Sequence, residues 1–93
     1  MWPYFRVIAQ CDSLQGLNLY ETGVSDRELK ELAGMPNLTN LELTGNGDVT
    51  DDGLVHLGSI QSLQKLGLWG TGVTRTGVEK LQDALPNCEI GWE

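Results

Sequence analysis

The chain contains few of the residues that support metal binding or covalent catalysis. It has two cysteines, Cys11 and Cys88, and one histidine, His56. This set falls short of the four ligands of a structural zinc site. The glycines do not form the G-x-x-x-x-G-K pattern of a phosphate-binding loop. We therefore expect no cofactor, no metal site and no enzymatic activity.

Positive charge is also scarce, because six lysines and arginines stand against 13 acidic residues and the net charge is −7. The basic residues are scattered along the chain and do not cluster. Surfaces that bind nucleic acids or anionic membranes usually carry a basic patch. We therefore expect neither kind of partner, and an acidic balance that serves solubility.

Long hydrophobic runs are absent as well, since none approaches the roughly 20 residues of a membrane span. The opening residues, MWPYFR, lack the charged start and long apolar stretch of a secretory signal. Two interpretations follow. The chain is cytoplasmic, or it is cut from a larger protein whose signal lay upstream, in which case it is extracytoplasmic.

What the sequence does contain is internal similarity. Three segments begin at Leu14, Leu38 and Leu63 and read LQGLNLYETGVSDRELKEL, LTNLELTGNGDVTDDGLVHL and LQKLGLWGTGVTRTGVEKL. Similarity at a period of 24 to 25 residues is typical of a solenoid. We predict a single domain over 1–93, with repeats at 14–37, 38–62 and 63–87 and a terminal strand at 88–93.

Each copy predicts a short strand followed by a polar turn. Two leucines alternate with outward-pointing residues and should face the core: Leu17 and Leu19, Leu41 and Leu43, Leu66 and Leu68. In the turn we expect Thr22, Asn46 and Thr71 to point inward and satisfy backbone groups.

A short helix is predicted next in each copy. Helix N-caps are expected at Ser25, Thr50 and Thr74. The first of these forms a capping box with Glu28, and Asp51 and Asp52 favour the positive end of the second helix dipole. The apolar helix positions recur three residues apart and should face inward: Leu29 and Leu32, Leu54 and Leu57, Val78 and Leu81.

Stacked copies keep the two cysteines apart. Cys11 falls in the first layer and Cys88 in the last, and neighbouring strands lie about 4.8 Å apart. A disulfide needs Cα atoms within roughly 7 Å. We therefore expect two buried thiols without a disulfide.

The two ends leave alternatives open. Residues 1–13 align with the back half of a repeat, with Phe5, Ile8 and Cys11 at apolar positions, and form either a partial repeat or an N-terminal cap. The last strand has two possible registers. In one, Ile90 and Trp92 point outward, and in the other, slipped by one residue, they point inward as an end cap.

The pattern L-x-x-L-x-L-x-x-T-x-V-T-D-x-G-L-x-x-L resembles bacterial leucine-rich repeat proteins, and is distantly similar to ribonuclease-inhibitor and F-box-associated repeats. The middle copy keeps VTDDGL at 49–54, and LQDALPNCEI at 81–90 is similar to the close of such an array. The resemblance covers residues 5–93. It implies an α/β, right-handed leucine-rich repeat solenoid with parallel strands on the concave face and short helices on the convex face. It implies protein interaction and no catalytic residues.

The outward strand positions are then the candidate binding surface, because aromatic residues are over-represented in interface hot spots. We predict non-catalytic binding of an unknown protein partner through Asn18, Tyr20, Asn40, Glu42, Thr44, Lys65, Trp69 and Trp92. Gly67 should leave a notch beside Glu42 and Trp69.

A second hypothesis gives the chain only a structural role, as the C-terminal closing segment of a longer leucine-rich repeat or multidomain protein. In that case the first strand, over 15–20, is an unpaired edge that invites self-association.

Overall fold

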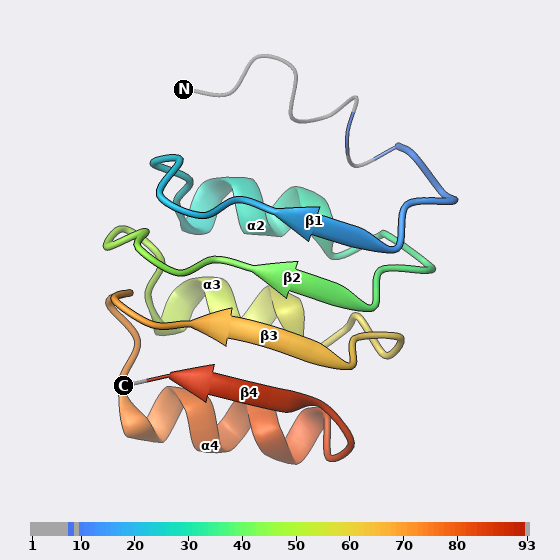
Figure 1. Ribbon diagram of the computed structural model, residues 1–93. Helices are drawn as coiled ribbons and strands as arrows, with labels where there is room; N and C mark the ends of the chain where they lie inside the picture. The colour runs from blue at the N-terminus through green and yellow to red at the C-terminus, as the bar shows by residue number, and fades with distance from the viewer. Residues whose placement is uncertain (1–7, 9, 93) are drawn as a thin grey trace.

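A computed structural model describes residue 8 and residues 10–92. In this part of the chain, strands and helices alternate in the order β1 (Gly16–Asn18), α2 (Asp26–Leu32), β2 (Asn40–Glu42), α3 (Asp51–Leu57), β3 (Lys65–Leu68), α4 (Arg75–Ala84) and β4 (Glu89–Trp92). The fold is therefore α/β, as the sequence predicts (Figure 1).

The four described strands form one parallel sheet in the order β1-β2-β3-β4. Helices α2, α3 and α4 lie side by side on one face of this sheet (Figure 1). We call the opposite sheet face the open face. Each helix connects two neighbouring strands, so short outward-facing segments from well-separated parts of the chain come together on the open face.

The strand register aligns the three similar segments as the sequence predicts. Gly16 pairs with Asn40 and Asn40 with Lys65, while Asn18 pairs with Glu42 and Glu42 with Gly67. These pairs form two columns across the first three strands, each made of residues 24 or 25 positions apart.

The fourth strand adopts the slipped register. Ile90 pairs with Leu66 and Trp92 with Leu68, and both side chains pack against the hydrophobic core. Trp92 therefore does not belong to the outward column, and its prediction as an outward binding residue is wrong. The physical reason is burial, because the other register would put Gly91 at an inward leucine position and leave two large apolar side chains in water.

The core lies between the sheet and the helices. The predicted inward leucines of β2 and β3 are buried, as are all six apolar helix residues, whereas Leu17 on β1 is half-buried. Ile8 packs against this core at the N-terminal side, as expected for an apolar position there. Phe5 lies outside the described residues.

The cysteines differ from each other in exposure. Cys88 is buried as predicted, and burial, together with the neighbouring Glu89, raises the pKa of its thiol. Cys11 is exposed, so the prediction that both thiols are buried is wrong for this residue. It follows Ile8 by a tight turn in which its N–H donates to the Ile8 carbonyl, 3.0 Å away, and the turn leaves Cys11 outside the core.

The turn residues satisfy backbone groups as predicted, but of the three Asn46 is buried, Thr71 is half-buried and Thr22 is exposed. The Asn46 amide is buried and donates to the carbonyls of Leu19 and Leu43, each at 2.8 Å. Its oxygen accepts from the backbone N–H groups of Thr22 and Gly23, at 3.0 and 2.8 Å. Asn46 thus joins two successive turns with every hydrogen-bonding position of its amide group in use.

Two shorter side chains act within their own turns. The Thr22 hydroxyl donates to the Leu19 carbonyl at 2.8 Å, and the Thr71 hydroxyl donates to the Leu68 carbonyl at 2.7 Å. Each side chain satisfies one carbonyl at the end of its strand, in contrast to the four contacts of Asn46.

The helix starts use two different caps. At α2, the Ser25 N–H and hydroxyl donate to Glu28 Oε1 at 2.8 and 2.7 Å, consistent with the predicted capping box. At α3 and α4 the N-cap hydroxyls of Thr50 and Thr74 accept from backbone N–H groups at the start of the helix. These two threonines also donate to an aspartate of the preceding helix.

Candidate functional site: the open face of the sheet

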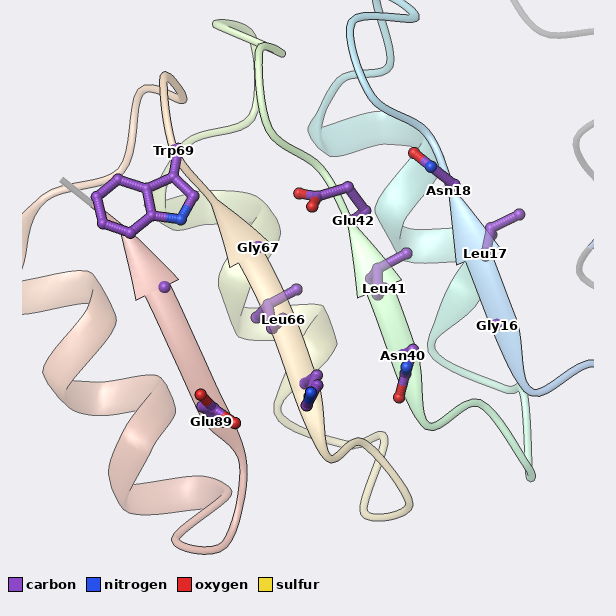
Figure 2. Close-up of a pocket in the computed structure, with 12 residues that line it drawn as sticks. Gly16, Leu17, Asn18, Asn40, Leu41, Glu42, Leu66, Gly67, Trp69 and Glu89 are labelled. Carbon is purple, nitrogen blue, oxygen red and sulfur yellow. The ribbon is translucent and has the colours of Figure 1, made fainter.

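The open face carries a shallow groove of about 510 Å³ that crosses all four described strands. Figure 2 shows the residues that line it. They include Asn18, Asn40, Glu42, Lys65 and Trp69 of the predicted set, together with Glu89 and three glycines, Gly16, Gly67 and Gly91. The groove has small residues on its floor because three of the four strands carry a glycine in one of the two columns.

Glu42 lies over Gly67. A Cβ atom placed on Gly67 would come within 2.8 Å of Glu42 Cδ and 2.9 Å of Oε2, so a larger residue there would require the carboxylate to move. The predicted notch at Gly67 is therefore filled by the neighbouring side chain. Glu42 Oε1 also accepts a hydrogen bond from the Thr44 N–H at 3.1 Å, which fixes the carboxylate above the sheet.

Trp69 lies over Gly91 in the same way. A Cβ atom on Gly91 would meet Trp69 Nε1 at 2.8 Å and Cε2 at 3.3 Å. Gly67 and Gly91 are partners in the register, so the carboxylate lies over β3 and the indole over β4. Neighbouring strands of a sheet are about 4.8 Å apart. Figure 2 shows the two side chains on either side of Gly67.

The other column carries both signs of charge. Lys65 pairs with Glu89 across β3 and β4, and with Asn40 across β2 and β3. The charge on Lys65 therefore has an opposite charge on the next strand. The column that begins at Asn18 differs, because it has one charged residue, Glu42. Glu42 lies between two uncharged register partners, Asn18 and Gly67.

A third row lies just beyond the ends of the strands. Tyr20 and Trp69 are the two large side chains exposed there, at 53% and 49%. Between them, Thr44 is half-buried and its hydroxyl oxygen is buried with no hydrogen-bond partner in the described structure. The row is thus mainly apolar and aromatic, next to a groove of polar side chains.

Seven of the eight predicted binding residues lie on or beside the open face: Asn18, Tyr20, Asn40, Glu42, Thr44, Lys65 and Trp69. Trp92 does not. The sequence reasoning missed Glu89, which takes the column position first given to Ile90. A comparison of the two registers could have found it, because the register that buries Ile90 and Trp92 instead of Gly91 places Glu89 on the open face.

The helix side carries a second hollow of about 370 Å³ between α3 and α4, with Val55, Gly58, Lys80 and Ala84 among its lining residues. His56 is half-buried on α3. Among the described residues, no group of three or more histidine, cysteine or acidic side chains is arranged to hold a metal ion. None of the helices in this part of the chain is long and apolar enough to cross a bilayer.

Comparison with known proteins adds no family assignment. No family model matches the chain, and a search of curated proteins finds no significant match. The geometry of the open face is therefore the basis for assigning a function.

Proposed function

We propose that this chain is a leucine-rich repeat solenoid whose open face binds a protein partner and that it carries out no catalysis. The observation that carries this proposal is the combination on one face of a groove across four strands and two exposed aromatic side chains, Tyr20 and Trp69. Tyrosine and tryptophan are enriched among the residues that dominate binding energy.

The groove suits an extended protein segment. Its polar side chains, Asn18, Asn40, Glu42 and Lys65, offer donors and acceptors at the spacing of the strands. The aromatic row beside it offers apolar area, so a partner could combine hydrogen bonds in the groove with stacking at the edge.

Selection of peptides from a random displayed library, with the immobilised chain as target, tests this proposal. We expect the selected peptides to bind Trp69→Ala at least tenfold more weakly. The matched control is Val55→Ser, which removes a 75% exposed apolar side chain from the helix side and should leave the affinity unchanged. The melting temperature of Trp69→Ala should stay close to that of the parent protein, because half of the indole is already exposed.

Equal binding by the two variants would contradict the proposal. A large fall in the melting temperature of Trp69→Ala would instead indicate that the indole serves stability by covering the last strand.

A second function is favoured by one observation at the helix starts. Asp26 and Asp51, each the first residue of a helix, bind the next N-cap, but Arg75 occupies that position in α4. A cation cannot accept these hydrogen bonds. We therefore keep the alternative that the chain is a structural closing segment of a longer leucine-rich repeat protein, with no ligand of its own.

Self-association belongs to this alternative. β1 pairs with β2 on one side, and no other described strand pairs with its outer edge. Light scattering over a range of concentrations tests it, because a mass that stays monomeric would argue against association through β1.

A further inference from the structure

Glu42 places a negative charge on the open face, and the described residues give it no cationic partner. Glu42 is the one charged residue of its column. Within the described residues, its carboxylate accepts a hydrogen bond from the Thr44 N–H. The hydrogen bond uses Oε1, so Oε2 keeps its lone pairs for a ligand. Lys65 stands in the other column, opposite Glu89 in the strand register, and the residue opposite Glu42 on β3 is Gly67.

The Trp69 indole adds an aromatic surface next to this charge. It rests on Gly91, and Figure 2 shows the ring lying over the strand with one face turned toward the open side. Half of the side chain is exposed, so a ligand can reach that face. A tryptophan face attracts cations through its quadrupole, with the ring centroid within about 6 Å of the charge.

We propose that Glu42 and Trp69 form a subsite for an arginine side chain of an extended segment of the partner protein. The proposal rests on the proposed function of the open face. The planar guanidinium would stack on the exposed indole face and donate to Oε2 of Glu42. Because Gly67 and Gly91 carry no side chains, the Glu42 carboxylate and the Trp69 indole can lie low on the sheet.

The geometry favours arginine over the other charged side chains. Stacking and a directed hydrogen bond to a carboxylate both suit a planar guanidinium, whereas a lysine ammonium is a compact, strongly hydrated point charge. An acidic side chain would meet Glu42 and a chain with a net charge of −7, so it is disfavoured by repulsion.

The test uses a peptide from the library selection that depends on Trp69, and a second version in which its arginine is replaced by citrulline, a neutral side chain of the same shape. We expect citrulline to weaken binding to the parent chain about tenfold. On Glu42→Gln, the preference for arginine over citrulline should shrink to about two- to fivefold, the part supplied by the indole face. Glutamine keeps the acceptor for the Thr44 N–H, so the fold is preserved.

Glu89→Gln is the matched control, because it removes an acidic charge from the same face but from the Lys65 column. It should leave the preference for arginine unchanged. Salt dependence provides a measurement on the parent chain alone. Its affinity for the arginine peptide should fall more steeply with added salt than its affinity for the citrulline peptide.

The outcomes separate the subsite from the function. Peptides that depend on Trp69 but bind equally well with citrulline would overturn the arginine subsite and leave the binding function standing. Peptides that do not depend on Trp69 would overturn both. A concentration-dependent dimer that Glu42→Gln dissociates would make a second copy of the chain the occupant and overturn the partner assignment.

Discussion

Asp51 accepts two hydrogen bonds from Thr74, one from the backbone N–H at 2.8 Å and one from the hydroxyl at 2.5 Å. Asp26 accepts the same two bonds from Thr50. The first residue of one helix thus satisfies the N-cap of the next helix, in addition to favouring the dipole of its own helix. These contacts connect neighbouring segments outside the hydrophobic core.

The contact between Asp51 and Thr74 places the Asp51 carboxylate against Gly77, at the third position of α4, where a side chain would force the carboxylate to move. A Cβ atom on Gly77 would lie 2.8 Å from Asp51 Oδ2. The first helix has Glu28 at the corresponding position, and there the glutamate itself accepts from Ser25. The N–H and hydroxyl of an N-cap residue therefore find their acceptor in one of two places. In α2 the acceptor is a glutamate of the same helix, and in α3 and α4 it is an aspartate of the preceding helix.

The Gly77→Ala variant tests this interpretation, because the contact with Asp51 predicts a fall in the free energy of unfolding where helix propensity alone predicts a rise. Alanine normally stabilises a helix by roughly 1 kcal/mol relative to glycine. Here we expect a loss of about 1–3 kcal/mol in the free energy of unfolding, because the methyl group would displace the Asp51 carboxylate. Urea denaturation gives the measurement.

The control for this variant is Gly34→Ala, since a Cβ atom on Gly34 would meet nothing within 4 Å. The double variant Asp51→Ala/Gly77→Ala should be more stable than the sum of the single effects predicts, because removal of the carboxylate removes the clash. Additive effects would argue that Asp51 and Gly77 do not interact.

Thr44→Val should leave the stability unchanged or raise it by about 1 kcal/mol. The Thr44 hydroxyl oxygen is buried without a partner, so its removal costs no hydrogen bond and relieves a desolvation penalty. The matched variant is Thr71→Val, which loses the bond to the Leu68 carbonyl and should be destabilised by about 1–2 kcal/mol. Thermal unfolding of both variants makes the comparison, and an equal loss in both would contradict it.

The Glu28 capping box predicts a pH dependence. Burial alone would raise the pKa of Glu28, but hydrogen bonds from the Ser25 hydroxyl and backbone and from its own backbone lower the pKa below 4.5. A carboxyl group with a lowered pKa in the folded state adds stability above its unfolded pKa, and this stability is lost as the pH falls through the folded value.

We therefore expect the stability difference between the parent chain and Glu28→Gln to shrink as the pH falls from about 6 to about 2. Glutamine keeps the shape of the cap and removes the charge. Glu79→Gln, an exposed position on α4, should show a much smaller change with pH. A difference for Glu28→Gln that stays constant over the range would contradict the account.

The sequence predicts the elements well, because the positions that build them recur. Inward leucines, turn residues such as Asn46 and the helix caps follow from alternation and from known cap chemistry. Seven of the eight candidate surface residues follow from the same alternation, since each is the direct neighbour of an inward leucine in the sequence. The strand pairs of β1, β2 and β3 include four of them, Asn18, Asn40, Glu42 and Lys65.

The remaining features depend on contacts between segments. The register of β4 could not be chosen from alternation alone, since the segment from Glu89 to Trp92 alternates equally well in both registers. The contacts of Glu42 with Gly67 and of Asp51 with Thr74 join residues more than 20 positions apart. A glycine in the first turn of a helix, as at Gly77, is the signal that could have indicated such a contact, because glycine there otherwise costs stability.

The most direct test of the central claim is a map of backbone amide NMR shifts as a library-selected peptide is added to the chain. The account predicts that the largest changes fall on the open face, along β1 to β4 at Asn18, Asn40, Lys65 and Glu89, and at the Trp69 indole N–H. Changes confined to the helix side, around Val55 and Lys80 in the hollow between α3 and α4, would contradict it.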